Sequence, residues 1–184
     1  MKLIAYTAAA LLSCYAMSAC ADGFSVTSTT VKEGARLPET HVLNGFGCHG
    51  GNQSPAIAWK DAPQGTKSFA VTMYDPDAPT GSGWWHWVVY DIPASLSGLP
   101  AGAGSPDGKS LPPGAIQART DFGTPGYGGA CPPAGSQPHR YRITVHALKV
   151  ERLDLAADAS AAMVGFMLNA NSLGNATLQA IYSR

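Results

Sequence analysis

The sequence predicts a mainly β single domain with one or two helices near its C-terminus. Gly and Pro contribute 21 and 14 of the 184 residues, and only 13% of the residues are charged. This composition favours short strands joined by long, shaped loops over a helical bundle. Hydrophobic residues make up 45% of the chain without a long polar tract between them, so we expect a packed core rather than disorder.

The first 21 residues have the layout of a secretory signal peptide. Lys2 precedes an apolar run, and Ala19-Cys20-Ala21 fits a cleavage site of small residues. We therefore expect residues 1–21 to be removed, which leaves residues 22–184 as one domain in the periplasm or outside the cell. The apolar run is too short and too mild for a transmembrane anchor, so we do not expect an integral membrane protein.

Acylation of Cys20 is the alternative fate of the N-terminus. Met17-Ser18-Ala19-Cys20 can be interpreted as a lipobox, although Met17 is an atypical first residue for one. Cleavage at either place removes Cys14 from the mature chain. Cleavage after Ala21 also removes Cys20. Because Met17 is atypical, we favour export as a free protein over a lipoprotein.

Two cysteines, Cys48 and Cys131, remain after that cleavage. An even pair in an oxidising compartment is a candidate disulfide. The alternative is two separate buried thiols, because the sequence does not show whether the two residues lie close together. Neither cysteine belongs to a CxxC motif, so we expect no zinc site at this pair.

Five segments have the alternating or β-branched and aromatic character of strands. They are residues 24–31, 56–59, 68–74, 86–92 and 140–150. The tail differs, because residues 158–169 are rich in Ala and Met and predict a helix capped by Asp158 or Ser160. Residues 175–182 predict a second short helix.

Two Gly-rich loops, residues 44–55 and 120–137, interrupt these elements. Loops carry function more often than strands do. Near them, Asp75 and Asp77 end one predicted strand, and His86 and His139 open two others. Two imidazoles and two carboxylates at one rim of a sheet, with prolines stiffening the walls, suit an anion or phosphate site.

Simpler interpretations exist for each part of this cluster. An Asp beside a Pro is usually a turn former, and a lone His at a strand edge is usually structural. The tryptophans that follow Gly83 are more often packing residues than a stacking platform. Zinc held by His86, His139 and one Asp is the minority alternative, and we expect no metal because no HxH or HExxH spacing occurs. We expect no serine nucleophile, because no GxSxG motif occurs.

Charge argues against a nucleic-acid partner. The chain has 12 Lys and Arg against 12 Asp and Glu, so its formal net charge is zero. Binding to a polyanion depends on clustered positive charge, which this composition does not supply.

Four strings of residues together resemble the phosphatidylethanolamine-binding protein family, also called Raf kinase inhibitor protein-like. They are DPDAP, WWHWVVYDIP, GYGGACPP and HRYRITVHAL. The chain is most similar to the bacterial YbhB/YbcL-type branch, from about residue 24 to residue 184. The resemblance implies a large central antiparallel sheet flanked by a smaller sheet, with C-terminal helices. It also implies a small surface pocket for phosphate-like anions.

Matching the motifs of the family residue by residue gives a set of pocket residues. The set is Asp75, Asp77, Pro79, Trp84, His86, Pro132, Pro133, His139 and Tyr141. One departure is Cys131, where many eukaryotic members have Gly. If Cys131 is bonded to Cys48, the pocket rim is tied to the loop of residues 44–55, so eukaryotic ligand preference does not transfer simply.

We therefore expect a non-enzymatic, cofactor-free binding module for small phosphate-bearing or anionic ligands. One alternative is a hydrolase that uses His86 and His139 with Asp75 or Asp77 as acid and base. The other is a regulator whose pocket docks a phosphorylated or acidic group of a protein partner. The kinase-inhibitor role of mammalian members does not transfer automatically, because an exported bacterial-type protein would not normally meet a cytosolic kinase.

Overall fold

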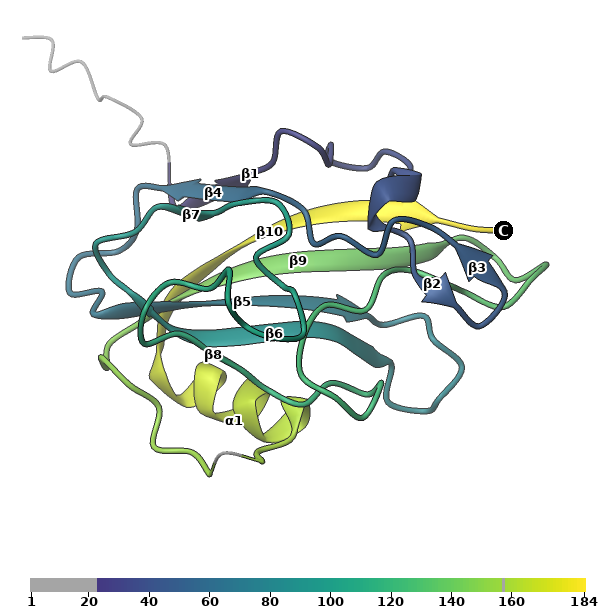
Figure 1. Cartoon of the computed structure of the whole chain (residues 1–184). Helices are drawn as coiled ribbons and strands as arrows, with labels where there is room; N and C mark the ends of the chain where they lie inside the picture. The colour runs from purple at the N-terminus through teal and green to yellow at the C-terminus, as the bar shows by residue number, and fades with distance from the viewer. Residues whose placement is uncertain (1–22, 157) are drawn as a thin grey trace, which may run out of the picture.

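The computed structural model describes residues 23–156 and 158–184, so the expected signal peptide and its cleavage site lie outside the described residues. The described chain is mostly β, with one large sheet, two small sheets and a single C-terminal α-helix (Figure 1). The fold class predicted from the sequence is confirmed, with one helix in place of two.

The large sheet has five antiparallel strands in the order β10-β9-β5-β6-β8. Their bounds are Ser68–Asp75 for β5, Trp84–Pro93 for β6, Ile116–Gln117 for β8, His139–Leu148 for β9 and Ser172–Tyr182 for β10. The central strand β5 is almost wholly buried. Its apolar residues therefore alternate between two cores, one on each face of the sheet.

The smaller elements lie on one face of the large sheet. They are β1 (Ser25–Thr27), β4 (Ile57–Lys60) and β7 (Gly98–Leu99) in one sheet, β2 (Asn44–Gly45) and β3 (Cys48–His49) in a ribbon, and the 3-10 turn η1 (Glu39–His41). The core between the two larger sheets contains Val71, Met73, Ile143 and Val145, all fully buried. These residues all have odd numbers, because every second side chain of a strand points to the same face of the sheet.

The opposite face of the large sheet is partly covered by α1 (Ala161–Asn171) (Figure 1). The helix begins after Ser160, whose hydroxyl accepts a hydrogen bond from the Met163 amide, as an N-cap does. On the inner side of the helix, Val164 and Leu168 pack against residues of β5, β6 and β9. Phe166 stays 68% exposed on its outer side.

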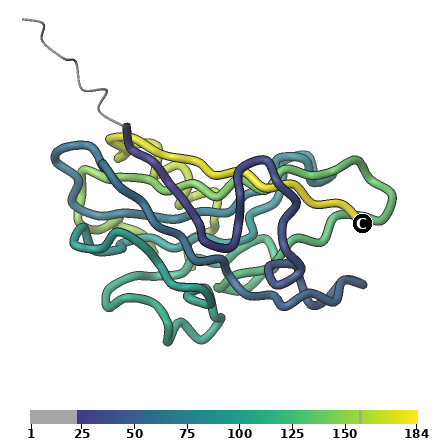
Figure 2. Tube along the Cα trace, turned by 90° about the horizontal axis from the view of Figure 1, so that it is seen from above, coloured from purple at the N-terminus to yellow at the C-terminus, as the bar shows by residue number. Residues whose placement is uncertain are grey.

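The N-terminal segment covers one edge of the large sheet. Figure 2 shows this purple segment crossing beside the yellow C-terminal strand. The amides of Gly34 and Leu37 donate to the carbonyls of Gln179 and Ile181, each at 2.8 Å. These bonds satisfy backbone groups that an open sheet edge would leave unpaired.

The prediction of a second helix at residues 175–182 is wrong. This segment belongs to β10, which is paired with β9 over its length. Ala176, Leu178, Ala180 and Tyr182 are buried and alternate with more exposed residues, so the segment has the period of a half-buried strand. The other predicted elements exist, although the first strand is shorter than expected and α1 begins at Ala161 rather than at residue 158.

Candidate functional site

A hollow of about 160 Å³ lies at the end of the large sheet where β5 ends and β6 and β9 begin. We call it the rim pocket. All the predicted site residues except Asp77 line it, namely Asp75, Pro79, Trp84, His86, Pro132, Pro133, His139 and Tyr141. Antiparallel pairing of β5 with both β6 and β9 brings these distant segments to one edge of the sheet.

Asp75 and His139 form the most buried ion-pairing contact of the pocket. The Nδ1 atom of His139 lies 2.7 Å from Oδ2 of Asp75, and the two side chains are only 6% and 4% exposed. The other carboxylate oxygen of Asp75 accepts a hydrogen bond from the Asp77 amide at 2.8 Å. Because both oxygens of Asp75 are engaged by donors, its charge is directed away from a ligand and toward His139.

His86 is held by the second Gly-rich loop. Its Nδ1 lies 2.8 Å from the Gly128 carbonyl oxygen, which can only accept, so Nδ1 carries a proton and Nε2 is the remaining ring nitrogen. Burial lowers the pKa of His86 below its ordinary value, while the carbonyls of Gly128 and Gly129 and the charge of Asp75 oppose that shift. His86 is therefore neutral at ordinary pH, and a nearby anion would favour its protonation.

Tyr141 supplies a third polar group to the pocket. Its ring packs edge-on to that of His86, with the centroids 5.2 Å apart. Its hydroxyl is buried without a hydrogen-bond partner among the described residues. Burial raises the pKa of this phenol, and the charge of Asp75 raises it further. The hydroxyl therefore stays protonated and can donate to a ligand oxygen.

Asp77 is the one residue of the expected set that does not line the rim pocket. Its carboxylate lies outside the rim pocket and binds Arg140 through the backbone amide at 2.8 Å, through Nε at 2.9 Å and through Nη2 at 2.6 Å. The Arg140 guanidinium lowers the pKa of Asp77 to about 2. Asp77 thus fixes the start of β9, where His139 lies.

Several pocket residues were missed by the sequence argument, and they are Leu43, Phe46, Ala78, Thr80 and Phe122. Phe46 is 73% exposed and stacks on Phe122 with the centroids 6.1 Å apart. Phe122 also meets the Trp84 ring edge-on at 5.3 Å. An aromatic residue inside each Gly-rich loop, Phe46 in the first and Phe122 in the second, was the available signal, because such a loop has few other large side chains.

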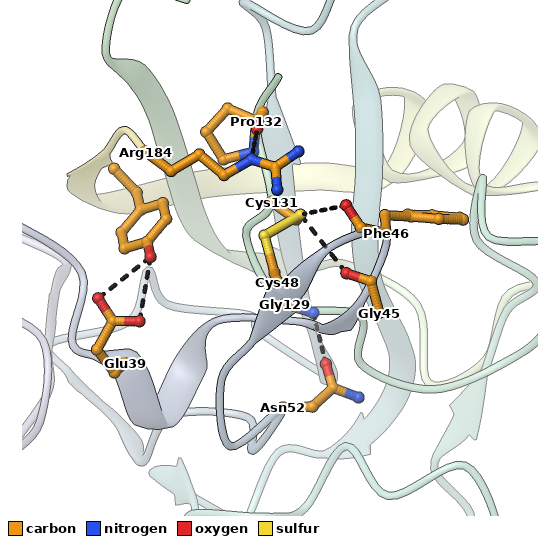
Figure 3. The surroundings of a disulfide bond; sticks show 10 residues. Glu39, Gly45, Phe46, Cys48, Asn52, Gly129, Cys131, Pro132 and Arg184 are labelled. Carbon is orange, nitrogen blue, oxygen red and sulfur yellow. Dashed lines mark hydrogen bonds between the residues drawn. A yellow bond between two sulfur atoms is a disulfide. The ribbon is translucent and has the colours of Figure 1, made fainter. Parts of the chain in front are cut away.

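A disulfide joins the two loops that border the pocket, which confirms the predicted pair (Figure 3). Cys48 and Cys131 are bonded, with their Cα atoms 6.0 Å apart. The Sγ atom of Cys131 lies 3.6 Å from the carbonyl oxygens of both Gly45 and Phe46. The bond therefore places Phe46 at the mouth of the pocket.

Further contacts strengthen the same junction. Asn52 accepts a hydrogen bond from the Gly129 amide at 2.8 Å, and Nε of Arg184 donates to the Pro132 carbonyl at 2.7 Å (Figure 3). The backbone carbonyl of Arg184 accepts from the Gly135 amide. Arg184 therefore holds the segment that contains the pocket proline Pro132 through two hydrogen bonds, one to Pro132 and one from Gly135.

Among residues 23–156 and 158–184, no helix is long and apolar enough to cross a membrane. Within the same residues, no group of three or more His, Cys, Asp or Glu side chains is arranged to hold a metal ion.

The fold is that of the phosphatidylethanolamine-binding protein family. The model of that family matches residues 27–183, so the chain belongs to it. More particularly, it is 54% identical to YbcL of Escherichia coli over 172 residues, which are 94% of each protein. It is also 54% identical to YbhB of Escherichia coli over 156 residues, 85% of this chain and 98% of that one.

Solved structures give the same assignment. The crystal structure of Escherichia coli YbcL, described as a member of the mammalian PEBP family, superposes with a TM-score of 0.86 at 55% identity. That match covers 88% of this chain and 98% of YbcL. A phosphatidylethanolamine-binding protein of Plasmodium vivax, 17% identical, matches with a TM-score of 0.55 over 88% of this chain and 85% of that one, which shows the shared fold alone.

Proposed function

We propose that this protein is a non-enzymatic, cofactor-free binding protein, located in the periplasm, that holds a small phosphate-bearing or otherwise anionic ligand in the rim pocket. The observation that carries the proposal is the arrangement around Asp75. Its two oxygens accept from His139 and from the Asp77 amide, which leaves ring nitrogens and the Tyr141 hydroxyl as the polar groups for a ligand.

The electrostatics of the pocket suit an anion that is bound through few, strong contacts. A carboxylate beside an imidazole can balance the positive charge of a protonated ring, so His139 can donate to an anion without leaving an uncompensated buried charge. His86 is neutral until an anion or a lower pH favours its protonation. Hydrogen bonds to charged groups contribute about 1.5–3 kcal/mol each, so two such contacts suffice for a measurable affinity.

The composition of the pocket supports binding rather than turnover. Cys131 is bonded to Cys48 and is therefore no free thiol, and Thr80 donates its hydroxyl to the Gly83 carbonyl. The lining thus offers the imidazoles no serine or cysteine that they could activate. A small hollow of about 160 Å³ suits a phosphorylated headgroup or a small free molecule.

Calorimetric titration of O-phosphoethanolamine into the mature protein tests the proposal. We expect saturable binding to one site and no release of inorganic phosphate on prolonged incubation. Release of phosphate from it or from p-nitrophenyl phosphate, lost on His86→Ala substitution, would instead establish a hydrolase. Saturable binding that is unchanged in a His86→Ala, His139→Ala double variant would place the site elsewhere.

One feature favours a protein as the carrier of the anion. Phe46 lies at the mouth of the pocket, 73% exposed, where it could contact residues that flank a phosphorylated or acidic side chain. Capture of periplasmic proteins on wild-type protein and on a Phe46→Ser variant tests this form of the proposal. A partner retained equally by both proteins would not be docked at the rim pocket.

Periplasmic location has its own test. We expect the mature protein to be released from the periplasm by osmotic shock and to begin at Asp22. N-terminal sequencing and the intact mass establish both the cleavage site and any modification. A diacylated Cys20 would replace the free periplasmic protein with a lipoprotein.

A further inference from the structure

A second hollow, of about 560 Å³, lies on the other face of the large sheet between the strands and α1. We call it the helix-side groove. The residues that matter here are Thr72, Trp85, Arg142, Thr144, Phe166 and Thr177. Even-numbered residues of β9 face this groove, whereas odd-numbered residues such as Tyr141 line the rim pocket, so the sheet separates the two hollows.

The helix-side groove has one fixed positive charge and none that is negative. Arg142 lines it, and none of the lining residues is Asp or Glu. Within residues 23–156 and 158–184, no carboxylate pairs with Arg142. Arg140, two residues earlier on the same strand, is by contrast neutralised by Asp77 at 2.6 Å. The groove therefore attracts a monoanion, and a guanidinium binds a carboxylate through two parallel hydrogen bonds.

Neutral polar groups surround Arg142. The hydroxyls of Thr144 and Thr177 lie 2.9 Å apart across β9 and β10. Below them, His146 contacts the Thr72 hydroxyl through Nε2 at 3.3 Å, and its Nδ1 is buried without a partner among the described residues. Burial lowers the pKa of His146 to about 4, so this ring adds no charge at ordinary pH. The hydroxyls of Thr144 and Thr177 can complete the hydrogen bonding of a bound carboxylate.

The remaining wall of the groove is aromatic. Trp85 packs against Tyr74 with the ring centroids 4.7 Å apart, and both residues line the groove. Phe166 stands above on α1 and is 68% exposed. Gly165 allows α1 to approach the indole ring closely, because a Cβ atom there would lie 3.3 Å from Trp85. Tyr74, Trp85 and Phe166 thus give the groove an aromatic lining that a flat apolar group can contact.

We propose that the helix-side groove binds a small aromatic carboxylate, with its carboxylate at Arg142 and its ring between Trp85 and Phe166. The single unpaired guanidinium matches the charge of a monoanion, and the aromatic wall matches a flat apolar body. This site is separate from the rim pocket and does not depend on the function proposed for it.

The test uses 2-naphthoate and two-dimensional NMR of the ¹⁵N-labelled mature protein. We expect saturable shifts of the amides of Thr144, Gly165 and Thr177, with no saturable shift at His86 or Gly128. Arg142→Gln should weaken binding by about tenfold or more, because one charge-assisted contact is lost. Arg142→Lys, which retains the charge but not the planar fork, should have a smaller effect.

Matched controls separate a specific site from general attraction of anions. Lys149→Gln removes an exposed positive charge directly after β9, outside the lining of the helix-side groove, and should leave the affinity for 2-naphthoate unchanged. Neutral 2-naphthalenemethanol should bind much more weakly than 2-naphthoate, and inorganic phosphate should not shift the groove amides. Unchanged affinity in Arg142→Gln, shifts confined to the rim pocket, or no saturable shift at all would overturn the proposal. Spectra of each variant alone verify that it is folded.

Discussion

Nδ1 of His139 and Oδ2 of Asp75 lie 2.7 Å apart, and both side chains are less than a tenth exposed. Asp75 ends β5 and His139 begins β9, so this one contact joins two neighbouring strands where they reach the rim pocket. The same two residues therefore contribute both to the stability of the sheet end and to the proposed binding of an anion.

Replacing Asp75 with Asn should destabilise the protein by about 1–3 kcal/mol, because the amide keeps only one acceptor oxygen and one of the two buried donors, His139 or the Asp77 amide, is left without a partner. Asp77→Asn is the matched control, since Asp77 and Arg140 are 27% and 46% exposed and an exposed pair contributes only about 0–1 kcal/mol. Urea denaturation of the two variants measures the difference. Equal losses in the free energy of unfolding would mean that burial does not make the contacts of Asp75 more stabilising than those of Asp77.

His86→Ala and His139→Ala should each weaken the binding of O-phosphoethanolamine by roughly ten- to a hundredfold, since each removes one charge-assisted hydrogen bond. The fold should persist, which circular dichroism verifies. His49→Ala provides the control, because His49 is an exposed histidine outside the pocket lining. An affinity that is reduced equally in all three variants would not support a specific role for the pocket histidines.

Anion affinity should increase as pH falls below the ordinary imidazole pKa of 6.5. The physical cause is that burial lowers the pKa of His86, so the protonated ring that holds an anion is populated only at lower pH. Sulfate is the suitable probe, because its charge is constant over this range. In His86→Gln the pH dependence should become shallower, and an unchanged profile would assign the effect to another group.

Loss of the disulfide should lower the free energy of unfolding by about 2–4 kcal/mol, because the bond closes a loop between residues separated by 83 positions. A Cys48→Ser, Cys131→Ser double variant, compared with the oxidised wild type, measures this by denaturation. The unfolded, unreduced mature protein should also contain no thiol that reacts with a labelling reagent. Two labelled cysteines would contradict the bond.

His146 should make the protein less stable in acid. Its pKa is about 4 in the folded state against an ordinary 6.5, so the unfolded chain binds more protons between these values. Stability is fully present above pH 6.5 and falls by about 3 kcal/mol as pH decreases to about 4. In His146→Gln this part of the acid destabilisation should disappear, whereas an identical decline in both proteins would exclude His146 as its source.

The sequence was informative where a local pattern has one structural meaning. The alternation in β5 and β9 and the DPDAP and WHW motifs were sufficient to place Asp75, His86 and His139 at strand ends, and the structure has them there. Residues 175–182 were assigned to a helix because Ala and Leu favour helices. Pairing with β9 overrides that weak preference, since it buries every second side chain.

The partner of each side chain could not be deduced from spacing alone. Asp75 and Asp77 are equivalent in the sequence, yet one faces His139 and the other faces Arg140. Their separation depends on the turn after β5, in which the Asp77 amide bonds back to Asp75. Phe46 and Phe122 meet only because the disulfide and the loop contacts bring their two loops together.

The walls of the rim pocket come from segments as distant along the chain as Leu43 and Tyr141. Cys131 precedes β9 in the sequence, so closing the Cys48–Cys131 bond does not itself require His139 and Tyr141 to be in place. A chain that has this bond but has not yet paired β9 with β5 would lack two walls of the rim pocket. Binding at the rim pocket, as proposed, would therefore report a completed sheet, whereas the absence of free thiols would report the disulfide alone.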